Sequence, residues 1–218
     1  GEDLYFPSDF TDGKDSIKIN GLIWMGNADF MQSQIEEKLA KGFDCIKLKI
    51  GVDWKSEKEI IKKLREKFPK EQLELRVDAN GAFSYEEASM VLQELADLGI
   101  HSIEQPIKKS EVRSPKSEEN SEKKSTDCCI PWNKMARLCA ETPTPIALDE
   151  ELIGIIDFEE KKKLLETIKP QYIILKPALV GGFSGSDEWI AIAESLGINW
   201  WITSALESNI GLNAICQY

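Results

Sequence analysis

The chain has 218 residues, a formal net charge of −11, 42% hydrophobic residues and six tryptophans. This apolar content suffices for a sizeable core and excludes disorder along the whole chain. The acidic balance argues against nucleic acid or anionic membrane as the main partner, because binding to phosphates is driven by Lys and Arg. Because the sequence has no long uncharged apolar run and no basic stretch leading into an apolar one, we expect a cytoplasmic protein. Small molecules and other proteins remain as candidate partners.

Strand and helix patterns alternate along the sequence. Residues 1–16 have the character of a connector from a preceding domain, and the first strand is expected over 17–25. Further strands are predicted over 45–50, 73–77, 100–104, 146–149, 172–176 and 199–203. Helices are predicted over 29–41, from Asp53 or Ser56 to just before Pro69, and over 84–98, 132–139, 157–168, 186–196 and 209–217.

Seven strands, each followed by a helix, predict a parallel sheet covered by helices. The count favours an α/β fold of the (β/α)8 TIM-barrel type over residues 17–218, without the last strand. Residues 108–127 consist largely of Lys, Glu and Ser, so we expect a disordered insertion there. The five cysteines are odd in number and lack CxxC spacing, which argues against a disulfide framework.

Charged residues stand at the ends of the predicted strands, on the face opposite the apolar side chains. In the second strand, Lys47 and Lys49 alternate with apolar residues, and Asp78, Glu104, Asp149 and Lys176 end later strands. Steps of 29, 26, 45 and 27 residues separate Lys49 and these four, and the long step becomes 25 without the insertion. The C-terminal ends of barrel strands meet at one rim, so we expect these groups to converge there.

Three carboxylates without a neighbouring histidine or cysteine form an all-oxygen site that suits Mg²⁺ or Mn²⁺ better than zinc. The metal and one lysine can hold a substrate carboxylate while another lysine removes the adjacent proton. The predicted reaction class is therefore proton abstraction next to a carboxylate.

Several segments resemble the muconate-lactonising branch of the enolase superfamily, and two resemble its o-succinylbenzoate synthase family most. The branch-level segments are IKLKIG (46–51), RVDANGAFS (76–84), IEQP (103–106), IALDEEL (146–152) and ILKP (174–177). The family-level segments are INGLIWMG (19–26) and WWITSALESNIGLNAI (200–215). The resemblance covers nearly the whole chain except the insertion.

This resemblance implies a carbon–oxygen lyase of menaquinone biosynthesis. The reaction would be syn dehydration of 2-succinyl-6-hydroxy-2,4-cyclohexadiene-1-carboxylate to 2-succinylbenzoate through an enediolate. Asp78, Glu104 and Asp149 would be the metal ligands, and Lys49 would be the base and then the acid. The remaining implied roles are charge support by Lys47 and Lys176, and contacts to the succinyl end by Ser204 and Ser208.

Other interpretations remain open. The same ligands with Lys49 and Lys176 as two opposed bases would suit an N-acylamino acid racemase or dipeptide epimerase. A catalytically inactive barrel fragment is the third possibility, because relatives in the family usually carry an N-terminal capping domain and a final strand. We therefore expect a truncated product of a longer enzyme.

Smaller expectations concern residues near these positions. Asn80 either hydrogen-bonds a metal ligand or serves only the turn after its strand. Glu150 is expected to point outward by the strand period, and His101 to be a packing residue opposite the inward face. Trp200 and Trp201 are expected in the core.

Overall fold

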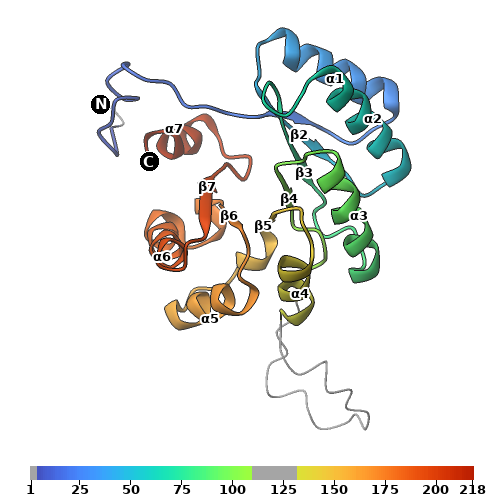
Figure 1. Ribbon diagram of the computed structural model, residues 1–218. Helices are drawn as coiled ribbons and strands as arrows, with labels where there is room; N and C mark the ends of the chain where they lie inside the picture. The colour runs from blue at the N-terminus through green and yellow to red at the C-terminus, as the bar shows by residue number, and fades with distance from the viewer. Residues whose placement is uncertain (1–3, 110–131) are drawn as a thin grey trace, which may run out of the picture.

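The computed structural model describes residues 4–109 and 132–218. Seven strands form one parallel sheet in the sequential order β1 to β7. The sheet curls into an open half-barrel with its helices on the outside (Figure 1). The predicted α/β barrel architecture is confirmed, and the predicted insertion lies outside the described residues except for Lys108 and Lys109.

Short strands alternate with longer helices. The strands are β1 (Gly21–Ile23), β2 (Cys45–Lys49), β3 (Glu74–Asp78), β4 (Ser102–Glu104), β5 (Ile146–Leu148), β6 (Tyr172–Leu175) and β7 (Asn199–Ile202). The α-helices are α1 (Ala28–Ala40), α2 (Trp54–Lys67), α3 (Tyr85–Asp97), α4 (Asn133–Glu141), α5 (Phe158–Ile168), α6 (Gly182–Ser195) and α7 (Asn209–Gln217). Two 3₁₀ turns, η3 (Glu150–Leu152) and η4 (Pro177–Leu179), follow β5 and β6.

Two element boundaries differ clearly from the prediction. The first strand has only three residues, because Ile17 and Ile19 are exposed by 46% and 66% and have no strand partner. Helix α6 begins at Gly182 rather than near Ser186, and Gly181 precedes it at φ +97°, a conformation that glycine adopts without strain. The Ser186 hydroxyl lies within the helix and donates to the carbonyl of Gly182 at 2.8 Å, so it is not a cap.

Side-chain caps explain where several helices start. Asn27 accepts a hydrogen bond from the first turn of α1, and Asp157 does the same for α5. Asp53 caps α2 by accepting from the backbone N–H of Ser56, which decides between the two predicted caps. Ser84 and Glu87 form a reciprocal capping box at α3.

The two faces of each strand have different surroundings. On β2, Ile46 and Leu48 are fully buried on the outer face, whereas Lys47 and Lys49 alternate with them on the inner face. The outer faces of β3 to β6 supply the same kind of core, which includes Leu75, Val77, Ile103, Leu148, Ile173 and Leu175. Burying each of these side chains contributes about 1.5–3 kcal/mol, so apolar packing against the helices fixes which face carries the lysines.

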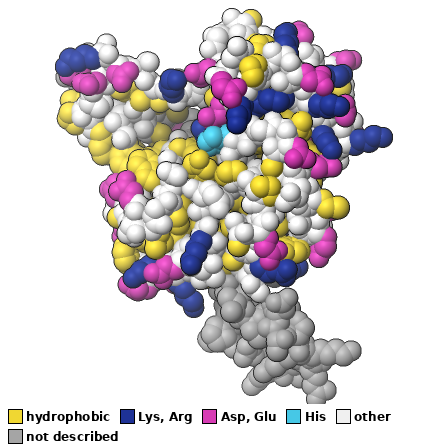
Figure 2. All heavy atoms as spheres, in the orientation of Figure 1, with side chains coloured by type: hydrophobic (Ala, Val, Ile, Leu, Met, Phe, Trp, Pro, Cys, Tyr) yellow, Lys and Arg dark blue, Asp and Glu magenta, His cyan; other side chains and the backbone are white. Residues whose placement is uncertain are grey.

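The segment that precedes β1 runs across to α7 (Figure 1). The backbone N–H groups of Tyr5 and Phe6 donate to Gln217 Oε1 at 2.7 and 3.2 Å, and the Phe6 ring packs on Phe183 and Tyr218. Figure 2 shows apolar side chains gathered beside this segment along the opening of the half-barrel, and charged side chains over α1 to α3. No helix among the described residues is long and apolar enough to span a membrane.

Candidate active site

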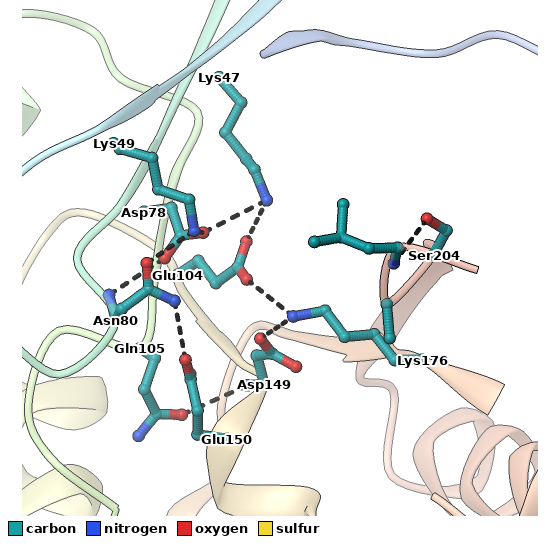
Figure 3. Close-up of polar contacts among 12 residues, drawn as sticks. Lys47, Lys49, Asp78, Asn80, Glu104, Gln105, Asp149, Glu150, Lys176 and Ser204 are labelled. Atoms are coloured by element: carbon teal, nitrogen blue, oxygen red, sulfur yellow. Dashed lines mark hydrogen bonds and ion pairs between the residues drawn. The ribbon is translucent and has the colours of Figure 1, made fainter. Parts of the chain in front are cut away.

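Six charged side chains meet at the C-terminal rim of the sheet, where the sequence predicts them (Figure 3). The register pairs Lys49 with Asp78 and Asp78 with Glu104, so these residues lie side by side on β2, β3 and β4. Asp149 and Lys176 directly follow β5 and β6. The three carboxylate residues are at most 2% exposed, which makes the site a buried charged cluster.

Ion pairs connect the lysines of β2 to the first two carboxylates. Lys49 Nζ lies 2.5 Å from Asp78 Oδ2, and Lys47 Nζ lies 2.6 Å from Glu104 Oε2 and 3.5 Å from Asp78 Oδ2. The side chains of both lysines are only 14% exposed. Burial of this kind requires opposite charge nearby, and the neighbouring strands supply it.

Lys176 closes the cluster from the opposite side. Its ammonium donates to Asp149 Oδ2 and lies 3.9 Å from Glu104 Oε1. Glu104 therefore lies between a lysine of β2 and the lysine that follows β6 (Figure 3). The ammonium groups of Lys47 and Lys176 therefore lie on opposite sides of the Glu104 carboxylate.

The surroundings shift the pKa values of Lys47, Lys176 and Glu104. Burial alone would lower the pKa of Lys47, but the carboxylates of Glu104 and Asp78 outweigh it and raise the pKa above its ordinary value. Burial likewise opposes the charge of Lys176, yet Asp149 and Glu104 raise its pKa. Burial raises the pKa of Glu104 to about 8, with a further contribution from Asp78 and Asp149 against the effect of Lys47. Burial is therefore the main cause of the raised pKa of Glu104, and it outweighs the lysine beside this carboxylate.

The carboxylates have the chemistry of a hard-cation site, although their side chains are turned toward lysines. Among residues 4–109 and 132–218, no group of three or more His, Cys, Asp or Glu side chains is arranged to hold a metal ion. Glu104 Oε1 is nevertheless buried without a hydrogen-bond donor. The buried side chains of Asp78 and Asp149 likewise offer carboxylate oxygens. The residue types therefore fit Mg²⁺ or Mn²⁺, which require oxygen ligands.

Asn80 and Glu150 extend the cluster at its outer edge. The Asn80 side chain accepts from Lys49 Nζ at 2.6 Å and donates to Glu150 Oε1 at 2.8 Å, while the Asn80 backbone N–H donates to Asp78 Oδ1 at 3.1 Å. The prediction that Glu150 points outward is wrong. The chain leaves the strand after Leu148 and turns into η3, so the period of two no longer applies at Glu150.

Gln105 and Glu151 were not predicted as parts of the site. Both are buried, at 1% and 0% exposure, and they hydrogen-bond each other behind the carboxylates at 3.2 Å. Its polar character directly after Glu104, the last residue of β4, was the only sequence signal for Gln105, and polar residues after strands usually lie in turns.

The two serines have different positions. Ser204 is half-buried in the loop after β7, on the Lys176 side of the cluster in Figure 3, and its hydroxyl accepts from Leu206 N–H at 3.2 Å. Ser208 is exposed at the N-cap position of α7, and its side chain makes no capping hydrogen bond.

The opposite end of the inner face is aromatic. His101 packs against Tyr172 and Trp201 with ring centroids 5.1 and 6.4 Å apart, so it is a packing residue as expected. Its ring lies among inward side chains, however, because His101 precedes β4 and does not follow the strand period. Trp200, expected in the core, is exposed by 37% on the outer face of the edge strand β7.

Comparisons with known proteins agree with this geometry. Residues 31–117 match a family model described as enolase C-terminal domain-like. The whole chain is 50% identical to the o-succinylbenzoate synthase of Desulfotalea psychrophila and covers 54% of that protein. It is also 33% identical over 177 residues to the N-succinylamino acid racemase of Thermus thermophilus, covering 81% of this chain and 40% of that protein.

A solved structure has the same fold over nearly the whole of this chain. The crystal structure of MenC from Desulfotalea psychrophila superposes with a TM-score of 0.83 at 49% identity, covering 99% of this chain and 54% of that one. The chain thus spans about half the length of the relatives that it matches. In its fold, its rim of charged residues and these similarities, the chain resembles the C-terminal domain of enolase-like proteins and is similar over its whole length to o-succinylbenzoate synthase.

Proposed function

We propose that the full-length protein containing this chain is an o-succinylbenzoate synthase. It would convert 2-succinyl-6-hydroxy-2,4-cyclohexadiene-1-carboxylate to 2-succinylbenzoate and water, a cytoplasmic step of menaquinone biosynthesis. The observation that carries the proposal is the meeting of three lysines and three buried carboxylates at one rim of the sheet. The 50% identity to a synthase of this reaction supports it.

Lys49 is the proposed acid and base. As a free amine it takes the proton next to the substrate carboxylate, and the electron pair of that C–H bond passes into the carboxylate as an enediolate. Lys49 then returns the proton to the hydroxyl group on the same face of the ring, which leaves as water while the ring becomes aromatic. Asn80 and Asp78, which both contact Lys49 Nζ, orient the amine for this transfer.

Lys47 and Lys176 are the proposed electrostatic partners. Each is held as a cation by buried carboxylates, through Glu104 for Lys47 and Asp149 for Lys176. Lys47 would face the substrate carboxylate, and Lys176 would stabilise the enediolate from the opposite face of the ring. Fixed charges in a buried site stabilise developing negative charge strongly because they need no reorganisation.

Asp78, Glu104 and Asp149 are the proposed ligands of Mg²⁺, with Mn²⁺ as a possible substitute. When bound, the cation would supply Lewis-acid stabilisation of the substrate carboxylate. Binding by these side chains requires that each turns partly away from its lysine, and the orphaned Oε1 of Glu104 is already without a donor. Ser204 and Ser208 are the proposed contacts to the succinyl end of the substrate, partly through backbone N–H groups at the start of α7.

Racemisation of an N-acylamino acid is the second candidate. Lys49 and Lys176 approach the carboxylate row from opposite sides, as two opposed bases would, and the chain is 33% identical to an N-succinylamino acid racemase. In that reaction Lys176 must exchange a proton with the substrate, whereas dehydration needs it only as a cation.

Parallel assays of the full-length protein with Mg²⁺ distinguish the two reactions. We expect formation of 2-succinylbenzoate, followed by its ultraviolet absorbance, at a kcat/KM well above that for racemisation of N-succinyl amino acids, followed by polarimetry. Faster racemisation would assign the chain to the second candidate. Absence of both activities in the folded, Mg²⁺-loaded protein would contradict the proposal.

A further inference from the structure

Gln105 occupies an unusual place directly behind the carboxylate cluster. It follows Glu104, is 1% exposed, and has a φ of +40°, in the left-handed region that non-glycine residues rarely adopt. A buried side chain on a strained backbone persists only where surrounding contacts hold it.

The Gln105 side chain uses both ends of its amide. Oε1 accepts from the backbone N–H groups of Asp149 at 3.3 Å and Glu151 at 3.2 Å. Nε2 donates to the carbonyl of Ile107 at 3.0 Å and to Glu151 Oε2 at 3.2 Å. One side chain therefore contacts both the segment after β4 and the segment after β5, where Asp149 directly precedes η3.

The Gln105 backbone adds connections to the neighbouring strand ends. Its N–H donates to the carbonyl of Ala147 at 3.0 Å, and its carbonyl accepts from Gly81 at 2.7 Å. Gly81 has a φ of +74°, and a Cβ there would lie 2.9 Å from the Cα of Lys108, so the segment after β3 packs tightly on the segment after β4. Through Gln105, the three strand ends bearing Asp78, Glu104 and Asp149 form one hydrogen-bonded unit.

We propose that Gln105 is a positioning residue that sets the spacing of the carboxylates, chiefly by holding the backbone of Asp149 against β4. This inference rests on the proposed function, because it takes the spacing of the three carboxylates to serve Mg²⁺ binding. Asp149 comes from a chain segment 45 residues away from Glu104, so a local turn cannot fix their separation, whereas the Gln105 amide contacts both sides directly.

Replacement of Gln105 by Met tests this role, since Met has similar length but cannot accept from N–H groups. The buried N–H groups of Asp149 and Glu151 then lose their acceptor, and the start of η3 can open locally. We expect faster hydrogen exchange at these two amides in the metal-free protein. We also expect Mg²⁺ affinity to fall about 10- to 100-fold, the range typical for groups that orient metal ligands.

Thr144→Val is the matched control. Thr144 is equally buried near the opposite end of β5, and its hydroxyl donates to the carbonyl of Leu92 at 2.5 Å. Its loss should lower the melting temperature as any buried hydrogen bond does, while the exchange of Asp149 and Glu151 and the Mg²⁺ affinity stay unchanged. Both variants are measured in the full-length protein by hydrogen–deuterium exchange with mass spectrometry and by isothermal titration with Mg²⁺.

The outcomes separate this inference from the proposed function. Wild-type affinity for Mg²⁺ and unchanged amide exchange in Gln105→Met would overturn the role of Gln105. Failure of the wild-type protein to bind Mg²⁺ would overturn both. If Gln105→Met does not fold, Gln105→Asn decides, because its amide is one methylene shorter and does not reach the N–H groups of Asp149 and Glu151. We expect the Asp149 amide to exchange faster in Gln105→Asn than in the wild type, and wild-type protection would contradict the inference.

Discussion

The inner face of the sheet carries two different kinds of chemistry at its two ends. At the rim, Lys47, Lys49 and Asp78 belong to a cluster held together by ion pairs. Nearer the N-terminal end of β3, Glu74 and Arg76 belong to a lower layer that contains aromatic rings: the Arg76 guanidinium lies 4.4 Å from the centroid of the Trp201 ring and 2.6 Å from Glu74.

The contrast shows how one face divides stability from function. The lower layer gains cation–π and aromatic contacts, with Tyr172 and Trp201 rings 5.3 Å apart, which stabilise the fold without reactive groups. At the rim, charged side chains are buried together, which costs free energy unless they are paired. Such clusters of buried charge are typical of functional sites. In barrels of this type, function belongs to the C-terminal end of the strands and stability to the N-terminal end.

Removal of the proposed base at the rim should have the largest effect, and this effect should be on kcat rather than on stability. We expect Lys49→Ala in the full-length protein to lower kcat about 10³-fold or more, because proton transfer loses its acceptor, while Mg²⁺ still binds. The matched control is Lys18→Ala, which removes an 88% exposed side chain paired with Asp44 and should leave kcat unchanged. Turnover retained in Lys49→Ala would refute the base assignment.

Neutralising a rim carboxylate should act on metal binding rather than on proton transfer. We expect Asp78→Asn to weaken Mg²⁺ binding at least about tenfold, since an amide is a poorer ligand for a hard cation than a carboxylate. Asp44→Asn changes the exposed partner of Lys18 and should have no effect. Equal Mg²⁺ affinity in the two variants, measured by calorimetry, would exclude Asp78 as a ligand.

A change in the lower layer should affect stability alone. Trp201→Ala removes the ring between Arg76, Tyr172 and His101, and we expect a loss of about 2 kcal/mol in the free energy of unfolding. Trp200→Ala, on the exposed outer face of the same strand, should cost less than about 1 kcal/mol. Urea unfolding compares the two variants. A larger loss of unfolding free energy in Trp200→Ala than in Trp201→Ala would contradict the assigned stabilising role of the inner ring.

The smallest expected effect is a pH dependence of stability in the lower layer. Burial lowers the pKa of His101, and Arg76 adds to this shift against the effect of Glu74. The unfolded chain therefore binds a proton more readily, and stability present at neutral pH is lost as the pH falls below about 6.5. His101→Phe should flatten the fall in unfolding free energy between pH 7.5 and 5.5. An unchanged slope would assign the pH dependence to other groups.

Strict periodicity explains why much of this molecule could be predicted from its sequence. Lys49, Asp78 and Glu104 lie within regular strands, so alternation and spacing were enough to predict their common rim. Glu150 and His101 lie just outside β5 and β4, where the backbone leaves the extended conformation and alternation fails.

Gln105 could not be predicted for another reason. Its role depends on a left-handed backbone and on hydrogen bonds to residues about 45 positions away, and neither leaves a pattern in nearby sequence. The same is true of the pairing of each carboxylate with a particular lysine, which depends on side-chain conformations and not on strand register.

Anomalous diffraction from crystals of the full-length protein grown with Mn²⁺ tests the central claim most directly. We predict one strong peak at the rim, with oxygens of Asp78, Glu104 and Asp149 about 2.1–2.2 Å away and the lysine ammonium groups displaced from them. A crystal with Mn²⁺ bound only elsewhere, and with the three carboxylates still paired to Lys47, Lys49 and Lys176, would contradict the account.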